Sequence, residues 1–115
     1  MPSFENPFSG NSIDKKLSTE ELLRAVRFML AAELEAIQMY RQVAEATDDE
    51  QAKKLINDIA DEEVVHAGEF ETLAAKLSPE DVKLIQKGNE EAEEKMGKLS
   101  CVSVSLRNAV KKLGE

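Results

Sequence analysis

The sequence contains little of several residue types, and each shortage excludes a class of protein. It has one cysteine, Cys101, so no disulfide can form within the chain and dithiol redox chemistry is excluded, as expected in a reducing compartment. No apolar run approaches the roughly 20 residues that span a bilayer. The segment from Met1 to Lys16 lacks the basic and apolar regions of a secretory signal. We therefore expect a protein without a membrane-spanning segment that stays in the cytosol, or in a compartment loaded from it.

Positive charge and aromatic side chains are also scarce. The 15 basic residues against 23 acidic ones give a formal net charge of -8. That charge repels the phosphates of nucleic acids and anionic membrane surfaces, and it attracts cations. Only 4% of the residues are aromatic while 42% are hydrophobic, so the core must consist mainly of Leu, Ile, Val, Ala and Met. We expect a single domain with neither a nucleic-acid nor a membrane partner.

Helix-start patterns divide the chain into three helices. Ser18-Thr19-Glu20-Glu21 has the S-x-x-E form of a capping box, and the polar cluster Thr47-Asp48-Asp49-Glu50 offers a second one. Ser78-Pro79 suits the N-cap and the first position of a third helix. We expect residues 1–17 to form a flexible N-terminal arm and residues 18–99 to form one helical domain.

The C-terminal part carries a weaker pattern. Apolar residues are sparser in the third helix, and Gly88 and Gly97 weaken it, so we expect it to be shorter or more mobile than the first two. The tail, residues 100–115, alternates as a strand would but fits a helix equally well. We favour a short terminal helix there.

Apolar residues in the first two helices recur at alternating steps of three and four, which is the pattern of a heptad seam. The first seam is Leu23, Val26, Leu30, Glu33, Ile37, Tyr40 and Ala44, and the second is Ile56, Ile59, Glu63, His66, Phe70, Leu73 and Leu77. Two long helices joined by a few residues must be antiparallel. The sequence therefore predicts an all-α fold, with an antiparallel two-helix hairpin followed by a shorter C-terminal helix.

Four polar side chains interrupt these apolar seams: Glu33 and Tyr40 in the first, Glu63 and His66 in the second. With the turn near Asp48, antiparallel pairing sets Glu33 opposite Glu63 and places His66 one helical turn along. Tyr40 lies two turns nearer the turn, and its ring points back at Glu33 because helical side chains lean towards the N-terminus. Two carboxylates and the only imidazole of the chain are therefore expected to converge.

Buried charges of this kind need a partner. Taking each charge out of water costs several kcal/mol, whereas a whole domain is stable by only about 5–15 kcal/mol. No Lys or Arg occupies either seam, so a bound cation is the best neutraliser. Carboxylate oxygens and an imidazole nitrogen suit iron, manganese or zinc better than calcium. The alternative is that Glu63-x-x-His66 is an ordinary polar pair, since Glu and His at this spacing are common on solvated helix faces.

The number of donors indicates the assembly. Ferritin-like di-iron carboxylate sites take one Glu from each of two helices and a Glu-x-x-His from each of two others, within a four-helix bundle. This chain, with its one histidine, supplies half of that set. A twofold dimer contributes Glu33, Glu63 and His66 twice around its axis, and it covers the apolar seams of both hairpins. We therefore expect dimerisation into a ferritin-like four-helix bundle.

Two stretches around these residues resemble a known family. The segments Ala32-Glu33-Leu34-Glu35-Ala36-Ile37-Gln38-Met39-Tyr40 and Asp61-Glu62-Glu63-Val64-Val65-His66-Ala67-Gly68-Glu69-Phe70 are the most specific part of a similarity that runs from about Glu20 to Lys98. Here the chain is similar to the encapsulated ferritins, the ferritin-like proteins of encapsulin nanocompartments. The resemblance implies that Glu33, Glu63 and His66 of two chains form an inter-subunit di-iron ferroxidase centre, with Tyr40 beside it.

The resemblance also implies partners and a location. It implies a ring of dimers, a decamer, that works inside an encapsulin shell in the cytoplasm and passes oxidised iron to the lumen of that shell. Ser105-Leu106-Arg107 resembles a packaging tag of such proteins, although an ordinary terminal helix fits equally well. Some members carry accessory acidic residues where this chain has Ala32 and Val65, so only Glu35 and Glu62 remain as candidates for accessory iron sites.

Three functions stay open at this point. The first is a ferroxidase that oxidises Fe(II) with O2 for iron storage and detoxification. The second is a rubrerythrin-like peroxidase or a manganese protein, although the Cys-x-x-Cys that rubrerythrins usually add is missing from this sequence. The third is a helical oligomer or adaptor without enzymatic activity, in which the acidic seam residues share protons across the dimer axis.

Overall fold

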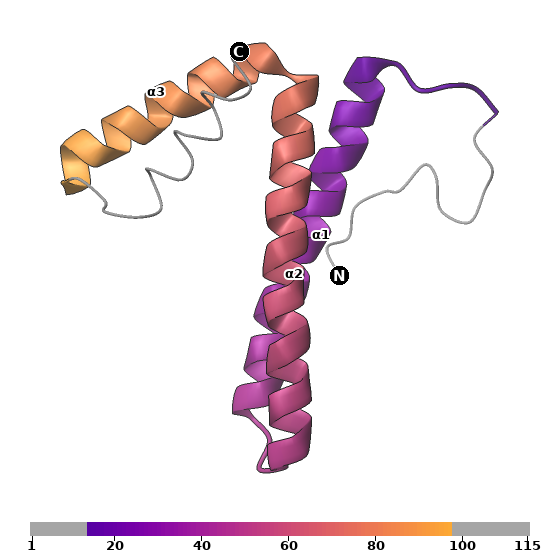
Figure 1. Cartoon of the computed structure of the whole chain (residues 1–115), viewed down its shortest axis with the longest axis vertical. Helices are drawn as coiled ribbons and strands as arrows, with labels where there is room; N and C mark the ends of the chain where they lie inside the picture. The colour runs from indigo at the N-terminus through magenta and orange to yellow at the C-terminus, as the bar shows by residue number, and fades with distance from the viewer. Residues whose placement is uncertain (1–13, 98–115) are drawn as a thin grey trace. The chain divides into compact units, whose positions relative to one another are not determined.

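The computed structural model describes residues 14–97, which form three α-helices and no strand. The helices are α1 (Thr19–Glu45), α2 (Glu50–Leu77) and α3 (Pro79–Met96) (Figure 1). The predicted all-α fold class is therefore confirmed over these residues. Most of the predicted N-terminal arm and the whole tail, with Ser105-Leu106-Arg107, lie outside the described residues. Among the helices that are described, none combines the length and the apolar character needed to cross a bilayer.

The first helix begins with the predicted capping box. The Ser18 hydroxyl accepts a hydrogen bond from the Glu21 backbone N–H at 3.1 Å, and the Glu21 carboxylate accepts one from the Ser18 backbone N–H at 3.1 Å. Lys15 adds an ion pair to the same carboxylate at 3.3 Å. The hydrogen bond from the Ser18 backbone is the largest of the causes that hold the pKa of Glu21 below its ordinary value of 4.5.

The second helix begins where predicted, but a different residue caps it. Asp49 Oδ1 accepts hydrogen bonds from the backbone N–H groups of Gln51 and Ala52, each at 3.1 Å. The Thr47 hydroxyl accepts from the Asp49 backbone N–H and so serves the turn. The prediction of a capping box built on Thr47 is therefore wrong. The Asp49 side chain immediately precedes the helix and reaches its first free N–H groups, whereas Thr47 stands too early in the chain.

The hairpin of α1 and α2 holds most of the buried side chains. The chain divides into two compact units, and the first of them ends at Glu71. Within this unit the buried apolar residues are mostly small: Leu23, Ala25, Val26, Ala44, Ala60 and Ala67. Many larger apolar side chains of the same two helices stay exposed: Phe28, Met29, Leu34, Met39, Val43, Leu55, Val64 and Val65. Each helix therefore buries only the narrow stripe that faces its neighbour.

The second unit, from Thr72 onward, contains the end of α2 and α3. With 18 residues, α3 is shorter than α1 with 27 and α2 with 28, as predicted. Ser78 is its N-cap residue, but the Ser78 side chain makes no capping hydrogen bond, and Pro79 takes the first helical position. Gly97 does not weaken the interior of the helix as predicted. With φ at 89° it ends the helix in a backbone conformation that favours glycine.

Candidate metal centre

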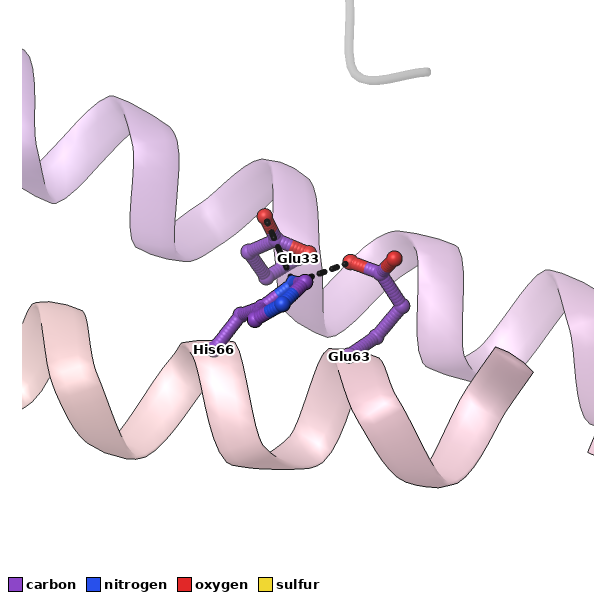
Figure 2. Close-up of side chains that lie close together, drawn as sticks. All are labelled: Glu33, Glu63 and His66. Carbon is purple, nitrogen blue, oxygen red and sulfur yellow. Dashed lines mark ion pairs between the residues drawn. The ribbon is translucent and has the colours of Figure 1, made fainter. Parts of the chain in front are cut away.

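Glu33 on α1 lies directly against Glu63 and His66 on α2 (Figure 2). One donor atom from each side chain can be chosen so that all three lie within 4.8 Å of one another. His66 Nδ1 is 3.5 Å from Glu63 Oε2 and 3.9 Å from Glu33 Oε1. The predicted convergence of these three residues, taken from two different helices, is confirmed.

Helical spacing and the short turn account for this arrangement. Glu63 and His66 are three residues apart, so both project from the same face of α2, and Figure 2 shows both side chains reaching towards α1. The turn between Glu45 and Glu50 reverses the chain and brings the Glu33 turn of α1 to the level of the Glu63 turn of α2. All three side chains therefore lie on helices, and the short turn sets the register between them.

The three side chains differ in exposure. The side chains of Glu33 and Glu63 are 21% and 19% exposed, whereas that of His66 is 47% exposed. The carboxylates thus lie within the hairpin interface, and the imidazole lies at its edge. The residues of the two seams are less buried in a single chain than their pattern predicts. The reason is that each helix of a hairpin covers only one side of the other. One face of the site is left open towards solvent.

The donor chemistry fits a transition metal ion. Carboxylate oxygens and imidazole nitrogens bind such ions at about 2.0–2.2 Å, so neighbouring donors in a tetrahedral or octahedral site lie roughly 3–3.6 Å apart. The 3.5 Å between His66 Nδ1 and Glu63 Oε2 is in that range, and the 3.9 Å between His66 Nδ1 and Glu33 Oε1 is slightly above it. Iron, manganese and zinc all accept this ligand type.

Tyr40 is placed on the same helix as Glu33 but farther along it. It is half-buried and lies seven residues after Glu33, which corresponds to about 10 Å of helix rise. Its role beside the site stays a prediction. The same holds for Glu35, which is half-buried, and Glu62, which is exposed, as accessory acidic residues.

One cross-helix contact near the site was not predicted. Arg41 Nη2 on α1 lies 3.5 Å from Asp61 Oδ1 on α2, and both side chains are largely exposed. An exposed pair of this kind contributes little to stability, typically up to about 1 kcal/mol. Heptad counting could not find it, because neither residue belongs to a seam and the long arginine side chain reaches across the register.

Comparisons with known proteins agree with this fold. A sequence model of the rubrerythrin family matches residues 24–112. A ferritin-like–encapsulin shell fusion protein of Pyrococcus furiosus is 42% identical over 84 residues, which cover 73% of this chain and 24% of that protein. The encapsulin nanocompartment cargo protein EncC of Myxococcus xanthus is 41% identical over 75 residues, which cover 65% of this chain and 57% of that protein.

The chain thus spans about a quarter of one of these curated relatives and somewhat more than half of the other. A solved structure covers the fold more completely. The crystal structure of the encapsulated ferritin domain from Pyrococcus furiosus matches with a TM-score of 0.74 at 39% identity, over 83% of this chain and 96% of that one. The chain therefore belongs to the rubrerythrin family, and it is an encapsulated-ferritin-like protein with the ferritin-like helical fold.

Proposed function

We propose that this protein is a ferroxidase, which oxidises Fe(II) to Fe(III) with O2 at a di-iron site shared between two copies of the chain. The observation that carries the proposal is the convergence of Glu33, Glu63 and His66, with donor atoms within 4.8 Å. Fe(II) is the substrate in this account. The three side chains would hold it, and the second copy would complete the ligand set.

The charge of the donor set supports oxidation in particular. Two half-buried carboxylates stabilise a triply charged cation more than a doubly charged one, because the attraction grows with the charge of the ion. Partial burial of Glu33 and Glu63 strengthens that preference by lowering the local dielectric. The site therefore favours the ferric over the ferrous state, which lowers the reduction potential of bound iron.

The exposed side of the site supports the participation of a second copy of the chain. One chain supplies half of the ligand set of a ferritin-like di-iron centre, and the imidazole of His66, 47% exposed, lies where a partner can approach it. The large apolar side chains exposed on α1 and α2 gain burial in the same step. In our proposal a twofold dimer forms the four-helix bundle, and five such dimers form the decameric ring.

The names of the relatives support a cellular location for this chain. One is a fusion of a ferritin-like domain with an encapsulin shell, and the other is an encapsulin nanocompartment cargo protein. We infer that this chain likewise works inside an encapsulin nanocompartment in the cytoplasm, where it passes oxidised iron to the lumen for storage and detoxification. The shell protein is then its partner, with Ser105-Leu106-Arg107 as the proposed docking tag.

The direct test is His66→Ala. Removing a group that only hydrogen-bonds to a metal ligand lowers metal affinity or activity by about 10–100-fold. Removing the ligand itself should therefore slow Fe(II) oxidation by about 100-fold or more. The matched control is Glu71→Gln, which removes an exposed carboxylate from the same helix and should keep the wild-type rate. Circular dichroism verifies that the helices of both variants persist. Undiminished oxidation by His66→Ala would contradict the proposal.

A second candidate is supported by the rubrerythrin family match. In that case peroxide replaces O2 as the oxidant, or manganese replaces iron. The lack of Cys-x-x-Cys in these residues speaks against the electron-transfer arrangement usual in rubrerythrins. Oxidation rates with O2 and with hydrogen peroxide, measured on the same metal-free protein, separate the two oxidants. Elemental analysis of the purified protein identifies the metal. Protein that carries no transition metal would favour the third function, a helical oligomer or adaptor without enzymatic activity.

A further inference from the structure

Two methionines of α1 are similarly exposed but differ in their position relative to the metal centre. Met29 is 48% exposed and Met39 is 43% exposed. Met29 lies four residues before Glu33, on the same helix face, with a Cβ separation of about 5–6 Å. Met39 lies six residues after Glu33, which is about 9 Å of helix rise and a different face. Met29 is therefore the nearer of the two methionines to Glu33 along α1.

The imidazole approaches Met29 from the other helix. α2 runs antiparallel to α1, so His66, three residues after Glu63, is level with the part of α1 about three residues before Glu33. That is the turn of α1 that carries Met29. Helix geometry thus places Met29 at the level of His66, within one helical turn of Glu33.

We propose that Met29 is a modification site, which peroxide formed at the metal centre converts to methionine sulfoxide. This inference rests on the proposed ferroxidase function. Two Fe(II) ions supply one electron each, so O2 and two protons become hydrogen peroxide while both ions become Fe(III). Hydrogen peroxide then breaks its O–O bond and transfers one oxygen to the Met29 sulfur, which loses two electrons, and the other oxygen leaves as water.

Proximity gives the selectivity. Peroxide that forms at the site meets the side chains around the site first, and a thioether within one helical turn can react before the peroxide leaves. Peroxide added to the solution has no such preference, and it oxidises methionines according to their exposure. By that measure Met96 on α3, 65% exposed, leads both methionines of α1. The two sources of peroxide therefore predict different orders of oxidation.

The test compares sulfoxide fractions by peptide mass spectrometry. Metal-free wild-type protein receives Fe(II) in air, with catalase present to remove peroxide that reaches the bulk, and the rate of Fe(II) oxidation is recorded in the same sample. A second sample receives hydrogen peroxide without iron. We expect Met29 to exceed Met39 and Met96 by about fivefold or more in the iron sample. In the peroxide sample we expect Met96 to lead.

The His66→Ala variant provides the control for the source of the oxidant. Its Met29 should lose the preference in the iron sample and keep its reactivity in the peroxide sample. Rapid oxidation of Fe(II) by the wild-type protein together with equal sulfoxide at Met29 and Met39 would overturn the inference and leave the ferroxidase proposal intact. Slow oxidation of Fe(II) by the wild-type protein would overturn both.

Discussion

Glu33→Gln should stabilise the metal-free protein while it removes iron oxidation. The carboxylates of Glu33 and Glu63 contribute oxygens that lie within 4.8 Å of each other. At that separation two negative charges repel by about 1 kcal/mol in water and by about 3 kcal/mol at an effective dielectric constant of 20. Because both side chains are only about one-fifth exposed, the upper part of this range applies. An uncharged glutamine keeps the size and the hydrogen-bonding capacity of the side chain without the repulsion.

Urea unfolding followed by circular dichroism measures the effect. The free energy of unfolding of metal-free Glu33→Gln, with a chelator present, should exceed the wild-type value by about 1–3 kcal/mol. Protein concentration must be equal in all samples, because assembly itself stabilises the folded state. A repeat in the His66→Ala background removes any charge of the imidazole from the comparison.

Glu71→Gln is again the matched control, since an exposed carboxylate should change stability by no more than about 0.5 kcal/mol. With Fe(II) added under anaerobic conditions, the wild-type protein should be more stable than Glu33→Gln, because the variant lacks one of the carboxylates that hold the ion. If metal-free Glu33→Gln is as stable as the wild type or less stable, the carboxylates do not strain the metal-free hairpin, and the need for a cation is refuted.

Three further substitutions test the ends and the interior of the helices. Ser18→Ala should lower the free energy of unfolding by about 0.5–2 kcal/mol near neutral pH. The pKa of Glu21 is lowered in the folded state, so the stabilisation by this carboxylate is complete above pH 4.5 and is lost as the pH falls through the folded pKa. Urea titrations should therefore show that the difference in free energy of unfolding between wild type and variant becomes smaller in acid. A difference that becomes larger in acid would contradict the capping box. Gly68→Ala should raise the free energy of unfolding by about 1 kcal/mol, because nothing lies within 4 Å of the added Cβ. Gly97→Ala should lower it, because φ is 89° there, and thermal unfolding that ranks these two variants the other way would refute this account of the glycines.

The helices and the convergence of Glu33, Glu63 and His66 could be predicted because both depend on local periodicity. Regular steps of three and four fix which face of a helix meets its neighbour, and the same pattern fixes which polar residues interrupt that face. Since a short turn leaves little freedom of register, Glu33 had to meet Glu63. Their contact with His66 then follows from helical geometry.

Other features depend on details that periodicity does not contain. Thr47 and Asp49 both suit a helix start, and only the reach of each side chain to the free N–H groups decides in favour of Asp49. The sequence predicts that Gly97 weakens the interior of α3, whereas its positive φ identifies it as the residue that ends the helix. The exposure of His66 could not be predicted either, because the seam gives the direction of the neighbouring helix but not how far that helix covers the imidazole.

Native mass spectrometry of anaerobic samples distinguishes a metal centre shared by two chains from one held by a single chain. We predict that Fe(II) converts the wild-type protein into dimers, or rings of dimers, that carry two iron ions per dimer. His66→Ala under the same conditions should retain no iron at this site. Iron bound one ion to each separate chain, or a dimer of the wild-type protein that binds no iron, would contradict a metal centre shared between two copies of Glu33, Glu63 and His66.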